Sequence, residues 1–541
     1  MKITYQQGKL IFPAESFGCT TVSISGEATD SSLTMEHTGQ ATEFSCSEIE
    51  ITYPAHKNAE FYRHGWNSWS PTSWWSLNKP PYRVWDNPPR SLTAEDGYSD
   101  NSEIHQSYLL TAIKLDPKKD LILLVGALGG ESGYFEIGNS LLTGRKLPDK
   151  TDDSALATPS NCHEDSGITW WVGVGKEIDV FSAYSTALGK SLNDKATNLS
   201  KYPGPIWSSW YSWFEEINEE IIESEIRPAA SSGYQVLEID DGWQTRIGDW
   251  QPNQKFPSGL ASLASKITAH GMKAGIWVSP FIAADNSAIV REHPEYFIHD
   301  FSGKLQPAGY NWGNYYYGLD CTHPGAQSWL RTILKTISNW GFTYFKLDFL
   351  NAAAVVGKRS QTVSREHAYR EGLKIIRETL PDAYLMGSGA VIGPSLGLVD
   401  GMRVSPDTAP YWDNTERKRD PSGPAVRNAA LNSLSRYWLK DLVALDPDVS
   451  FTRSRGSLLS PEANEVTQDL ARVCSVFSCS DPYTWLTQSE TEKIRDLCKE
   501  FKTPPTAEQI SRFHFRVENQ DIDFTPWLYP SERISDRILA K

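Results

Sequence analysis

Two short apolar segments of the chain each lead to an aspartate that follows a cation. The first reads Phe-Lys-Leu-Asp and ends at Asp348, two residues after Lys346. The second reads Met-Arg-Val-Ser-Pro-Asp and ends at Asp407, four residues after Arg403. The interval between the two aspartates is about one or two strand–helix units of a barrel. Two carboxylates on neighbouring strands of one barrel are the pair of groups that a retaining glycosidase needs.

The cations beside these aspartates bear on how the carboxyl groups ionise. Lys346 and Asp348 are two positions apart, so a strand points both side chains to one face. A buried lysine keeps a neighbouring carboxylate ionised, as a nucleophile requires. Arg403 and Ser405 share a face of their strand for the same reason.

A second pair of acids, Asp240 and Asp241, follows the apolar segment Gln235–Ile239. Adjacent carboxylates do not both ionise freely without partners, and one carboxylate can accept hydrogen bonds from two sugar hydroxyls. Binding of Mg²⁺ is the competing use of such a cluster. Because Lys346 and Arg403 beside the acids would repel a cation, we expect neither a metal ion nor another cofactor.

Tryptophan is unusually abundant, with 20 residues, and 12% of the chain is aromatic. Most single tryptophans are expected in the core. However, Trp66, Trp69, Trp74 and Trp75 lie within ten residues, in a segment rich in Ser, Asn and Pro. We expect this segment to be a loop that cannot bury all four rings. Aromatic faces around a pocket suit sugars, whose C–H faces are apolar while their rims are polar.

Composition argues against several classes of partner. The net charge of −15 disfavours nucleic acid and anionic membrane surfaces, and no apolar stretch reaches the length of a signal peptide or a membrane helix. The seven cysteines are scattered without a Cys-x-x-Cys pair. This favours free thiols in a reducing cytosol over a disulfide framework or a zinc site. We therefore expect a cytoplasmic protein that binds neither nucleic acid nor membrane.

The 541 residues are too many for one core, and the pattern changes twice along the chain. Residues 1–200 carry short apolar runs between Gly, Asn, Asp and Pro turns, which predicts an N-terminal β-sandwich domain. After Lys201-Tyr-Pro-Gly-Pro205, residues 201–485 alternate strand and helix patterns, which predicts a catalytic (β/α)8 TIM barrel. Residues 486–541 are expected to form a short C-terminal region packed on the barrel, with a helix at Thr491–Phe501.

Eight candidate strands support the barrel, with helices between them such as Ile217–Ser231 and Pro324–Trp340. A doubly wound sheet could use the same alternation, but no glycine-rich phosphate loop follows the first strand. The candidate strands are Ile206–Trp210, Gln235–Ile239, Lys273–Val278, Tyr344–Leu347, Tyr384–Met386, Met402–Ser405, Leu442–Leu445 and Ser475–Ser478. Because function in a barrel sits where the strands end, we expect the acids and cations above to gather there.

With these motifs in order, the chain resembles the α-galactosidases of glycoside hydrolase family 36. The likeness covers the β-rich N-terminal part and the whole barrel, and it rests on many separate motifs in the family's order. These are His64-Gly-Trp-Asn-Ser-Trp69, Trp207-Ser-Ser-Trp-Tyr211, Glu238-Ile-Asp-Asp-Gly-Trp243, Ala274-Gly-Ile-Trp-Val-Ser-Pro-Phe281, Tyr344-Phe-Lys-Leu-Asp-Phe349, Gly401-Met-Arg-Val-Ser-Pro-Asp-Thr-Ala-Pro-Tyr-Trp412, Asp446-Pro-Asp448 and Ser480-Asp481.

The resemblance implies a retaining exo-α-galactosidase and suggests a role for each site residue. Asp348 resembles the nucleophile and Asp407 resembles the general acid/base. The remaining residues would bind the galactosyl ring: Asp240 and Asp241 at its 4- and 6-hydroxyls, Lys346 and Arg403 as further ligands, Trp210 and Trp277 as pocket walls, Ser388 near the 2-substituent, and Trp66 lent by the N-terminal domain. Whether Trp66 serves its own barrel or a neighbouring subunit stays open, so an oligomer is compatible with the pattern.

Three departures from the family pattern bear on these expectations. The strand end that usually reads Gly-Cys-Gly is Gly387-Ser-Gly389, Leu445 stands where an asparagine usually precedes Asp-Pro-Asp, and the C-terminal β domain is shortened. The serine leaves open an α-N-acetylgalactosaminidase or a galactosyl-transferring enzyme on the same site. A metal-dependent barrel enzyme could use the same aspartates, and a carbohydrate-binding protein without catalysis would need only the tryptophans. The expected partner is a small α-galactoside.

Overall fold

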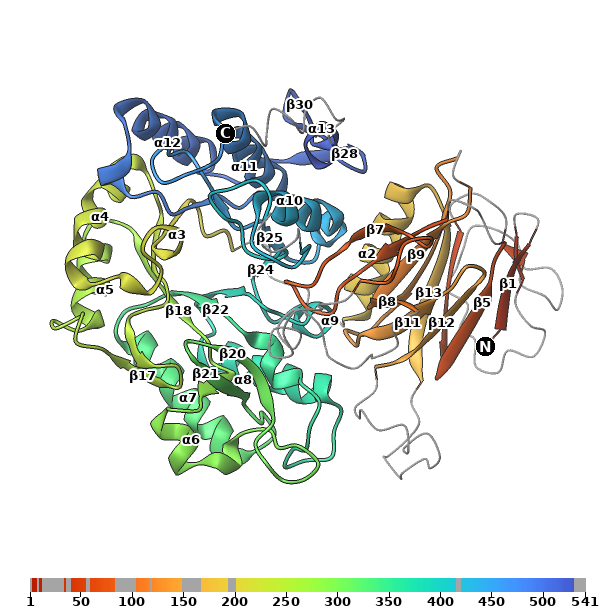
Figure 1. The fold of residues 1–541 in the computed structure, drawn as a ribbon, viewed down its shortest axis with the longest axis horizontal. Helices are drawn as coiled ribbons and strands as arrows, with labels where there is room; N and C mark the ends of the chain where they lie inside the picture. Colours follow the sequence, from red (N-terminus) through yellow and green to blue (C-terminus); the bar gives the residue numbers. More distant parts are fainter. Residues whose placement is uncertain are drawn as a thin grey trace.

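The computed structural model describes residues 2–6, 9–11, 34–35, 40–54, 59–82, 104–116, 119–147, 167–192, 201–414 and 420–529. Its elements form an N-terminal part made of sheets, a larger curled sheet surrounded by helices, and a small C-terminal part (Figure 1). No helix within these ranges is long and apolar enough to cross a membrane.

Two sheets make up the N-terminal part. Their strands are β1 Lys2–Gln6, β2 Lys9–Ile11, β3 Thr34–Met35, β4 Gln40–Cys46, β5 Glu48–Thr52, β6 Glu60–Arg63, β7 Ser73–Ser76, β8 His105–Tyr108, β9 Leu110–Lys114, β10 Ile122–Ala127, β11 Gly133–Ile137, β12 Leu141–Lys146 and β13 Ile168–Gly175. The strand order is β3-β2-β1-β5-β12-β11-β8 in one sheet and β4-β13-β10-β9-β6-β7 in the other. Ile51 and Phe135 of the first sheet share an apolar core with Leu123 and Trp170 of the second.

The tryptophan-rich segment is not one loop. Trp74 and Trp75 lie on strand β7, so the expectation of a loop is wrong for the second half of the segment. Trp66 is buried, with 1% of its surface exposed, whereas Trp69, Trp74 and Trp75 are half-buried. The rings that retain some exposure are therefore divided between a loop and a strand.

The central sheet is parallel and curled. Its strands are β14 Ile206–Ser208, β15 Val236–Ile239, β18 Lys273–Val278, β22 Tyr344–Leu347, β23 Tyr384–Gly387, β24 Gly401–Arg403, β25 Ala444–Asp446, β26 Val449–Ser450 and β27 Ser478–Cys479. The order is β25-β24-β23-β22-β18-β15-β14-β27-β26. Only Pro447 and Asp448 separate β25 from β26, so the two edges of the sheet come together in one segment of chain. This arrangement is consistent with the predicted (β/α)8 barrel.

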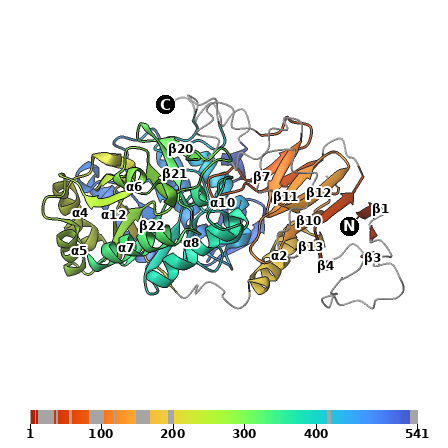
Figure 2. The ribbon, with the colours of Figure 1, turned by 90° about the horizontal axis from the view of Figure 1, so that it is seen from below.

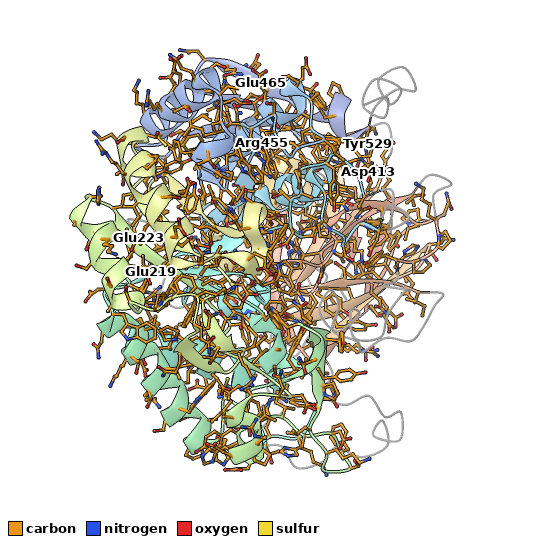
Figure 3. The ribbon with its side chains drawn as sticks, turned by 60° about the vertical axis from the view of Figure 1, so that its left-hand side comes forward. Glu219, Glu223, Asp413, Arg455, Glu465 and Tyr529 are labelled. Atoms are coloured by element: carbon orange, nitrogen blue, oxygen red, sulfur yellow. The ribbon has the colours of Figure 1, made fainter. Side chains whose placement is uncertain are left out.

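Helices cover the outside of the curled sheet (Figure 2). They are α4 Glu219–Ser232, α5 Leu260–Ala269, α7 Pro324–Asn339, α8 Arg365–Thr379, α10 Val426–Ser435 and α11 Pro461–Cys474. The short helices α3 Trp210–Trp213, α6 Ala288–Glu292 and α9 Ile392–Ser395 lie in the connections that follow β14, β18 and β23. In α4, Ile222 and Ile226 are buried, while Glu219 and Glu223 lie on its outer side (Figure 3). The apolar stripe therefore faces the sheet, as it does in any helix packed on a core.

Differences between predicted and observed strands concern their ends. Trp210 begins α3 instead of ending the first strand, and the last strand begins at Ser478 because Ser475, with a φ of 64°, ends α11. Strand β24 ends at Arg403, not at Ser405. Asp407 consequently lies in the loop after its strand, whereas Asp348 directly follows β22.

Three small antiparallel sheets do not follow from the sequence patterns. They consist of β16 Gln244–Arg246 with β17 Asp249–Pro252; β19 Ile282–Ala284 with β20 Pro307–Asn311 and β21 Asn314–Gly318; and β28 Ala507–Ser511 with β29 His514–Val517 and β30 Gln520–Asp523. The last sheet lies in the C-terminal part, between α12 Gln488–Glu500 and α13 Thr525–Leu528. The helix predicted at Thr491–Phe501 is α12.

The C-terminal sheet joins the N-terminal part through Arg512. Its guanidinium carbon lies 4.4 Å from the centre of the Trp74 ring, and its nitrogens donate to Glu177 at 2.7 and 2.9 Å, at the start of α2 Glu177–Ser191. Trp74 Nε1 donates to the same carboxylate at 3.0 Å. Arg512, Trp74 and Glu177 border a small cleft that Tyr62 and Trp438 complete.

Candidate active site

Lys346 joins two acids where the strands of the curled sheet end. It belongs to β22, whereas Glu238 belongs to β15 and Asp240 follows β15. Lys346 Nζ donates to Asp240 Oδ2 at 2.7 Å and lies 3.8 Å from Glu238 Oε1. Burial alone would lower the pKa of Lys346, but the charges of Asp240 and Glu238 outweigh it and raise that pKa. Lys346 is therefore a permanent cation at this end of the sheet.

Asp348, the first predicted catalytic residue, is 9% exposed at the end of β22. Trp277 Nε1, from β18, donates to Asp348 Oδ2 at 2.9 Å. The N–H of Phe349 donates to the other oxygen at 3.0 Å. Each oxygen is thus held by a donor, which fixes the direction in which the carboxylate presents its lone pairs.

Asp407, the second predicted catalytic residue, has a side chain that is 40% exposed. Arg403 Nη2 donates to its Oδ1 at 2.7 Å, and the same nitrogen lies 2.5 Å from Asp448 Oδ2. Burial, followed by the negative charges of Asp448 and Asp348, raises the pKa of Asp407, although Arg403 opposes them. Because water reaches the side chain, this shift is smaller than that of a fully enclosed acid. Its direction suits a group that must begin a reaction protonated.

The adjacent acids Asp240 and Asp241 are held in different charge states. Burial would raise the pKa of Asp240, but the charge and hydrogen bond of Lys346 lower it below its usual value. Burial raises the pKa of Asp241 to about 7, although Asp241 accepts hydrogen bonds from Gln244 Nε2 at 2.6 Å and Trp312 Nε1 at 2.8 Å. Asp240 is therefore an anion at neutral pH, whereas Asp241 titrates there.

Trp312 is a site residue that the sequence patterns did not single out. It lies in the turn between β20 and β21 with a φ of 51°, which a non-glycine residue seldom adopts. Its ring centre lies 5.2 Å from that of Phe349 and 6.5 Å from that of Trp277. The signal in the sequence is weak: two tyrosine-containing runs flank Trp312-Gly313, as strands flank a two-residue hairpin turn.

Trp69, in the N-terminal part, contacts Phe349, the residue after Asp348. Its ring centre lies 5.1 Å from that of Phe349, and the ring approaches Gly389 so closely that a Cβ atom there would lie 2.9 Å from it. Trp66 instead lies beneath the guanidinium of Arg365, 5.6 Å from the ring centre. The role of Trp66 at the pocket therefore stays a prediction.

Arg436 anchors the loop that carries Trp69 to the curled sheet. It is fully buried, with 0% exposure. Its guanidinium donates to the backbone carbonyls of Asn67, Ser68 and Ser70 at 2.8, 2.6 and 3.0 Å. It also donates to the carbonyl of Val404, next to Arg403, at 2.8 Å. One side chain thus fixes the N-terminal loop against the end of β24.

Trp210 and Ser388 complete the predicted set. Trp210 follows β14 and is half-buried, with its ring edge-on to that of Phe214 at 5.2 Å. Ser388 follows β23, and its N–H donates to the carbonyl of Leu347 at 2.7 Å. Ser388 therefore lies beside the strand residue that precedes Asp348.

Asp348 and Asp407 can together supply a nucleophile and an acid, because they are close enough for the charge of Asp348 to act on Asp407. Asp348 is held by neutral donors, whereas burial and like charges raise the pKa of Asp407. A carboxyl group with a raised pKa can act as the acid beside a second carboxyl group that acts as base or nucleophile. Lys346 pairs with Asp240, and Arg403 pairs with Asp407 and Asp448. No metal-binding group of three or more His, Cys, Asp or Glu residues occurs in the part of the chain that the structure describes.

Comparison with known proteins gives consistent matches. Residues 186–385 match the protein-family model Melibiase. The α-galactosidase of Thermus thermophilus, solved with p-nitrophenyl α-D-galactopyranoside, is 33% identical, and the alignment covers 91% of this chain and 96% of that chain with a TM-score of 0.79. The family 36 α-galactosidase AgaA of Geobacillus stearothermophilus shares the fold with a TM-score of 0.58 at 15% identity, over 87% of this chain and 64% of that one.

Curated relatives match over shorter segments. AgaA is 26% identical over 190 residues, which are 33% of this chain and 25% of AgaA. The A type blood α-D-galactosamine galactosaminidase of Flavonifractor plautii is 31% identical over 153 residues, which are 27% of this chain and 14% of that protein. The sequence alignments therefore cover no more than a quarter of either relative, whereas the structural alignment matches the Thermus thermophilus protein almost from end to end. On that match, the chain belongs to the α-galactosidases of glycoside hydrolase family 36.

Proposed function

We propose that the protein is a retaining exo-α-galactosidase that removes terminal α-D-galactosyl residues from oligosaccharides. The observation that carries the proposal is the pair of carboxylates that follow β22 and β24, Asp348 and Asp407, with their separate sets of hydrogen-bond donors. The Thermus thermophilus relative was solved with an aryl α-galactoside and with stachyose. These ligands support small α-galactosides as the substrate class.

In the proposed reaction, Asp348 attacks the anomeric carbon while Asp407 gives its proton to the leaving oxygen. The bond to the leaving group breaks and a galactosyl ester forms on Asp348. This ester carries no charge, so the pKa of Asp407 falls and its carboxylate can take a proton from water. Water then attacks the ester and releases galactose with retained configuration. Such pairs of carboxyl groups lie about 5–5.5 Å apart.

The galactosyl ring would be bound by the charged groups around this pair. Asp240 and Asp241 would accept hydrogen bonds from its hydroxyls, and Lys346 and Arg403 would donate to its oxygens. Aromatic side chains would form the walls of a pocket that accepts only a chain end, and these are Trp69, Trp210, Trp277 and Trp312. Trp69 and Trp312 both contact Phe349, directly beside Asp348.

Trapping the covalent intermediate tests this proposal. A fluorinated galactosyl inactivator should label Asp348, as peptide mass mapping would show. With azide and an activated aryl galactoside, Asp348→Ala should give β-galactosyl azide and Asp407→Ala should give α-galactosyl azide, because azide replaces the nucleophile in the first variant and the attacking water in the second. Label on another residue, or the opposite anomers, would refute the assignment.

Cleavage of α-N-acetylgalactosaminides is a second candidate. Ser388 lies beside Leu347, which precedes Asp348, and the Flavonifractor plautii relative is named for a galactosamine substrate. The ratio of kcat/KM for aryl α-galactoside to that for aryl α-N-acetylgalactosaminide decides between the two. Galactosyl transfer is tested by product analysis in the presence of sugar acceptors.

We also propose the domain limits 1–200, 201–485 and 486–541, with a β-sandwich first and a closed (β/α)8 barrel second. The shared core of the two N-terminal sheets supports the sandwich, and the meeting of β25 with β26 supports closure. A cytoplasmic location is supported by buried free thiols, namely Cys321, Cys474, Cys479 and Cys498.

A further inference from the structure

Asp448 lies where the two edge strands of the curled sheet, β25 and β26, meet. It lies between β25 and β26 with a φ of 81°, although it is not a glycine. Its N–H donates to Asp446 Oδ1 at 2.9 Å, and its side chain is 4% exposed. A non-glycine residue keeps such a backbone conformation only where its surroundings hold it, and such residues cluster at functional sites.

One oxygen of the Asp448 carboxylate binds several groups. Oδ2 lies 2.5 Å from Arg403 Nη2 and accepts hydrogen bonds from the Thr408 N–H at 2.7 Å and the Thr408 hydroxyl at 3.0 Å. It also accepts a hydrogen bond from the hydroxyl of Tyr211, in the helix after β14. Arg403 ends β24 and Thr408 directly follows Asp407. The carboxylate therefore connects three strand ends to the backbone beside Asp407.

We propose that Asp448 is a positioning residue that aims the Asp407 carboxyl group by holding Arg403 and the backbone of Thr408. The inference rests on the proposed role of Asp407 as the general acid/base. Arg403 is the link: the same nitrogen reaches both carboxylates, at 2.7 Å and 2.5 Å. When Asp448 is lost, Arg403 is free to move toward Asp407, and the loop after β24 loses its two hydrogen bonds at Thr408.

The charges around Asp407 predict how a variant changes its titration. After burial, the negative charges of Asp448 and Asp348 raise the pKa of Asp407, while the positive charges of Arg403 and Lys346 lower it. The substitution Asp448→Asn removes one of the two negative charges and leaves both positive ones. The pKa of Asp407 must then fall. Because the leaving oxygen needs a protonated acid, the basic limb of kcat/KM moves to lower pH.

The test compares pH profiles of kcat/KM for the wild type and Asp448→Asn, with an alkyl and a p-nitrophenyl α-galactoside. We expect the variant to lose about 100-fold on the alkyl substrate, as for a displaced catalytic group, and less on the aryl substrate, which needs little acid assistance. The basic limb should move to lower pH. Equal losses on both substrates, or an unmoved basic limb, would overturn the inference.

Two further variants distinguish a specific effect on Asp407 from a general effect of changing a buried aspartate. Asp400→Asn is the matched control, because Asp400 is also buried, pairs with Arg377 at 2.6 Å and accepts from a backbone N–H. Asp400 differs from Asp448 in that it precedes β24, whereas Asp407 lies beyond the other end of that strand. The acidic and basic limbs of the kcat/KM profile of Asp400→Asn should lie at the same pH as those of the wild type. If Asp448→Asn does not fold, Tyr211→Phe decides: a selective loss on the alkyl substrate supports the inference and an unselective one overturns it. A wild type without activity on either galactoside would instead refute the proposed function.

Discussion

At the scale of single residues, neighbours decide what each acid can do. Asp240 and Asp241 are adjacent and equally buried, yet Lys346 lowers the pKa of the first, whereas burial raises that of the second to about 7. The sequence shows two adjacent aspartates and a lysine on another strand. It does not show which of the two acids the lysine reaches, because that depends on how β15 and β22 lie on either side of β18.

The raised pKa of Asp241 predicts a stability effect with a defined sign. In the folded protein this acid resists ionisation, so folding is penalised increasingly as pH rises from about 4 to about 7. Asp241→Asn should therefore unfold at a higher temperature than the wild type at pH 8, by an amount that shrinks toward pH 4. The gain in the free energy of unfolding is roughly 4 kcal/mol at most, because each unit of pKa difference corresponds to about 1.36 kcal/mol. Scanning calorimetry across this range measures it.

Asp240→Asn is the control for this prediction and should behave oppositely. The pKa of Asp240 is lowered by Lys346, so its charge stabilises the fold at neutral pH and the variant should melt earlier there. Stabilisation of both variants, or of neither, would contradict the assigned charge states. Asp241→Asn should also weaken galactose binding above pH 7, where the wild-type carboxylate is ionised and accepts from sugar hydroxyls.

At the scale of elements, apolar periodicity predicted the strands and long helices well. Leu330, Leu334 and Ile337 are buried in α7, and they belong to the apolar residues, spaced three or four positions apart, that the prediction used. The hairpin of β20 and β21 escaped it, because its runs are short and tyrosine-rich. Its turn also places Trp312 at a φ that glycine or asparagine usually adopts. Local propensity therefore gives no indication of this site residue.

The hairpin residue Trp312 should matter for binding more than for chemistry. Trp312→Phe keeps an aromatic ring but removes the Nε1 donor that reaches Asp241 at 2.8 Å. Loss of a hydrogen bond to a carboxylate costs about 1.5 kcal/mol, or roughly tenfold in the dissociation constant of galactose. Titration calorimetry measures this constant, and kcat should change by less.

Tyr310→Phe offers a matched control for Trp312→Phe. Tyr310 belongs to the same hairpin but is 49% exposed, so its substitution should leave galactose binding unchanged. A wild-type dissociation constant for Trp312→Phe, or equal weakening by both substitutions, would remove Trp312 from the site.

At the scale of the whole molecule, the N-terminal part reaches the curled sheet through bonds that no sequence pattern reveals. The change from β-rich to alternating composition after residue 200 indicates two domains. The contact itself depends on Arg436, which binds backbone carbonyls far away in the chain, at Asn67, Ser68 and Ser70. Any residue type offers a carbonyl, so residue identity carries no signal for this interface. The family resemblance assigned Trp66 to the pocket, and the sequence did not indicate that Trp69, in the same motif, contacts Phe349.

Removing the Arg436 guanidinium should affect stability and activity together. Arg436→Met leaves four carbonyls without their donor, which should destabilise the protein by about 3–5 kcal/mol. It should also reduce kcat/KM, because Trp69 loses its support beside Phe349. Thermal unfolding and steady-state kinetics measure the two effects. Arg516→Met, which breaks an exposed ion pair with Asp521, should change stability by less than about 1 kcal/mol, and a comparable loss there would contradict this account.

The contact of Arg512 with Trp74 and Glu177 bears on the order in which parts of a newly synthesised chain fold. During translation, the N-terminal sheets leave the ribosome long before Arg512 is made, because synthesis runs from the N-terminus and domains fold as they emerge. Trp74 and Glu177 must wait for a partner encoded more than 300 positions later. A ribosome that stops before residue 512 would release a product in which Trp74 and Glu177 lack the Arg512 side chain that covers them.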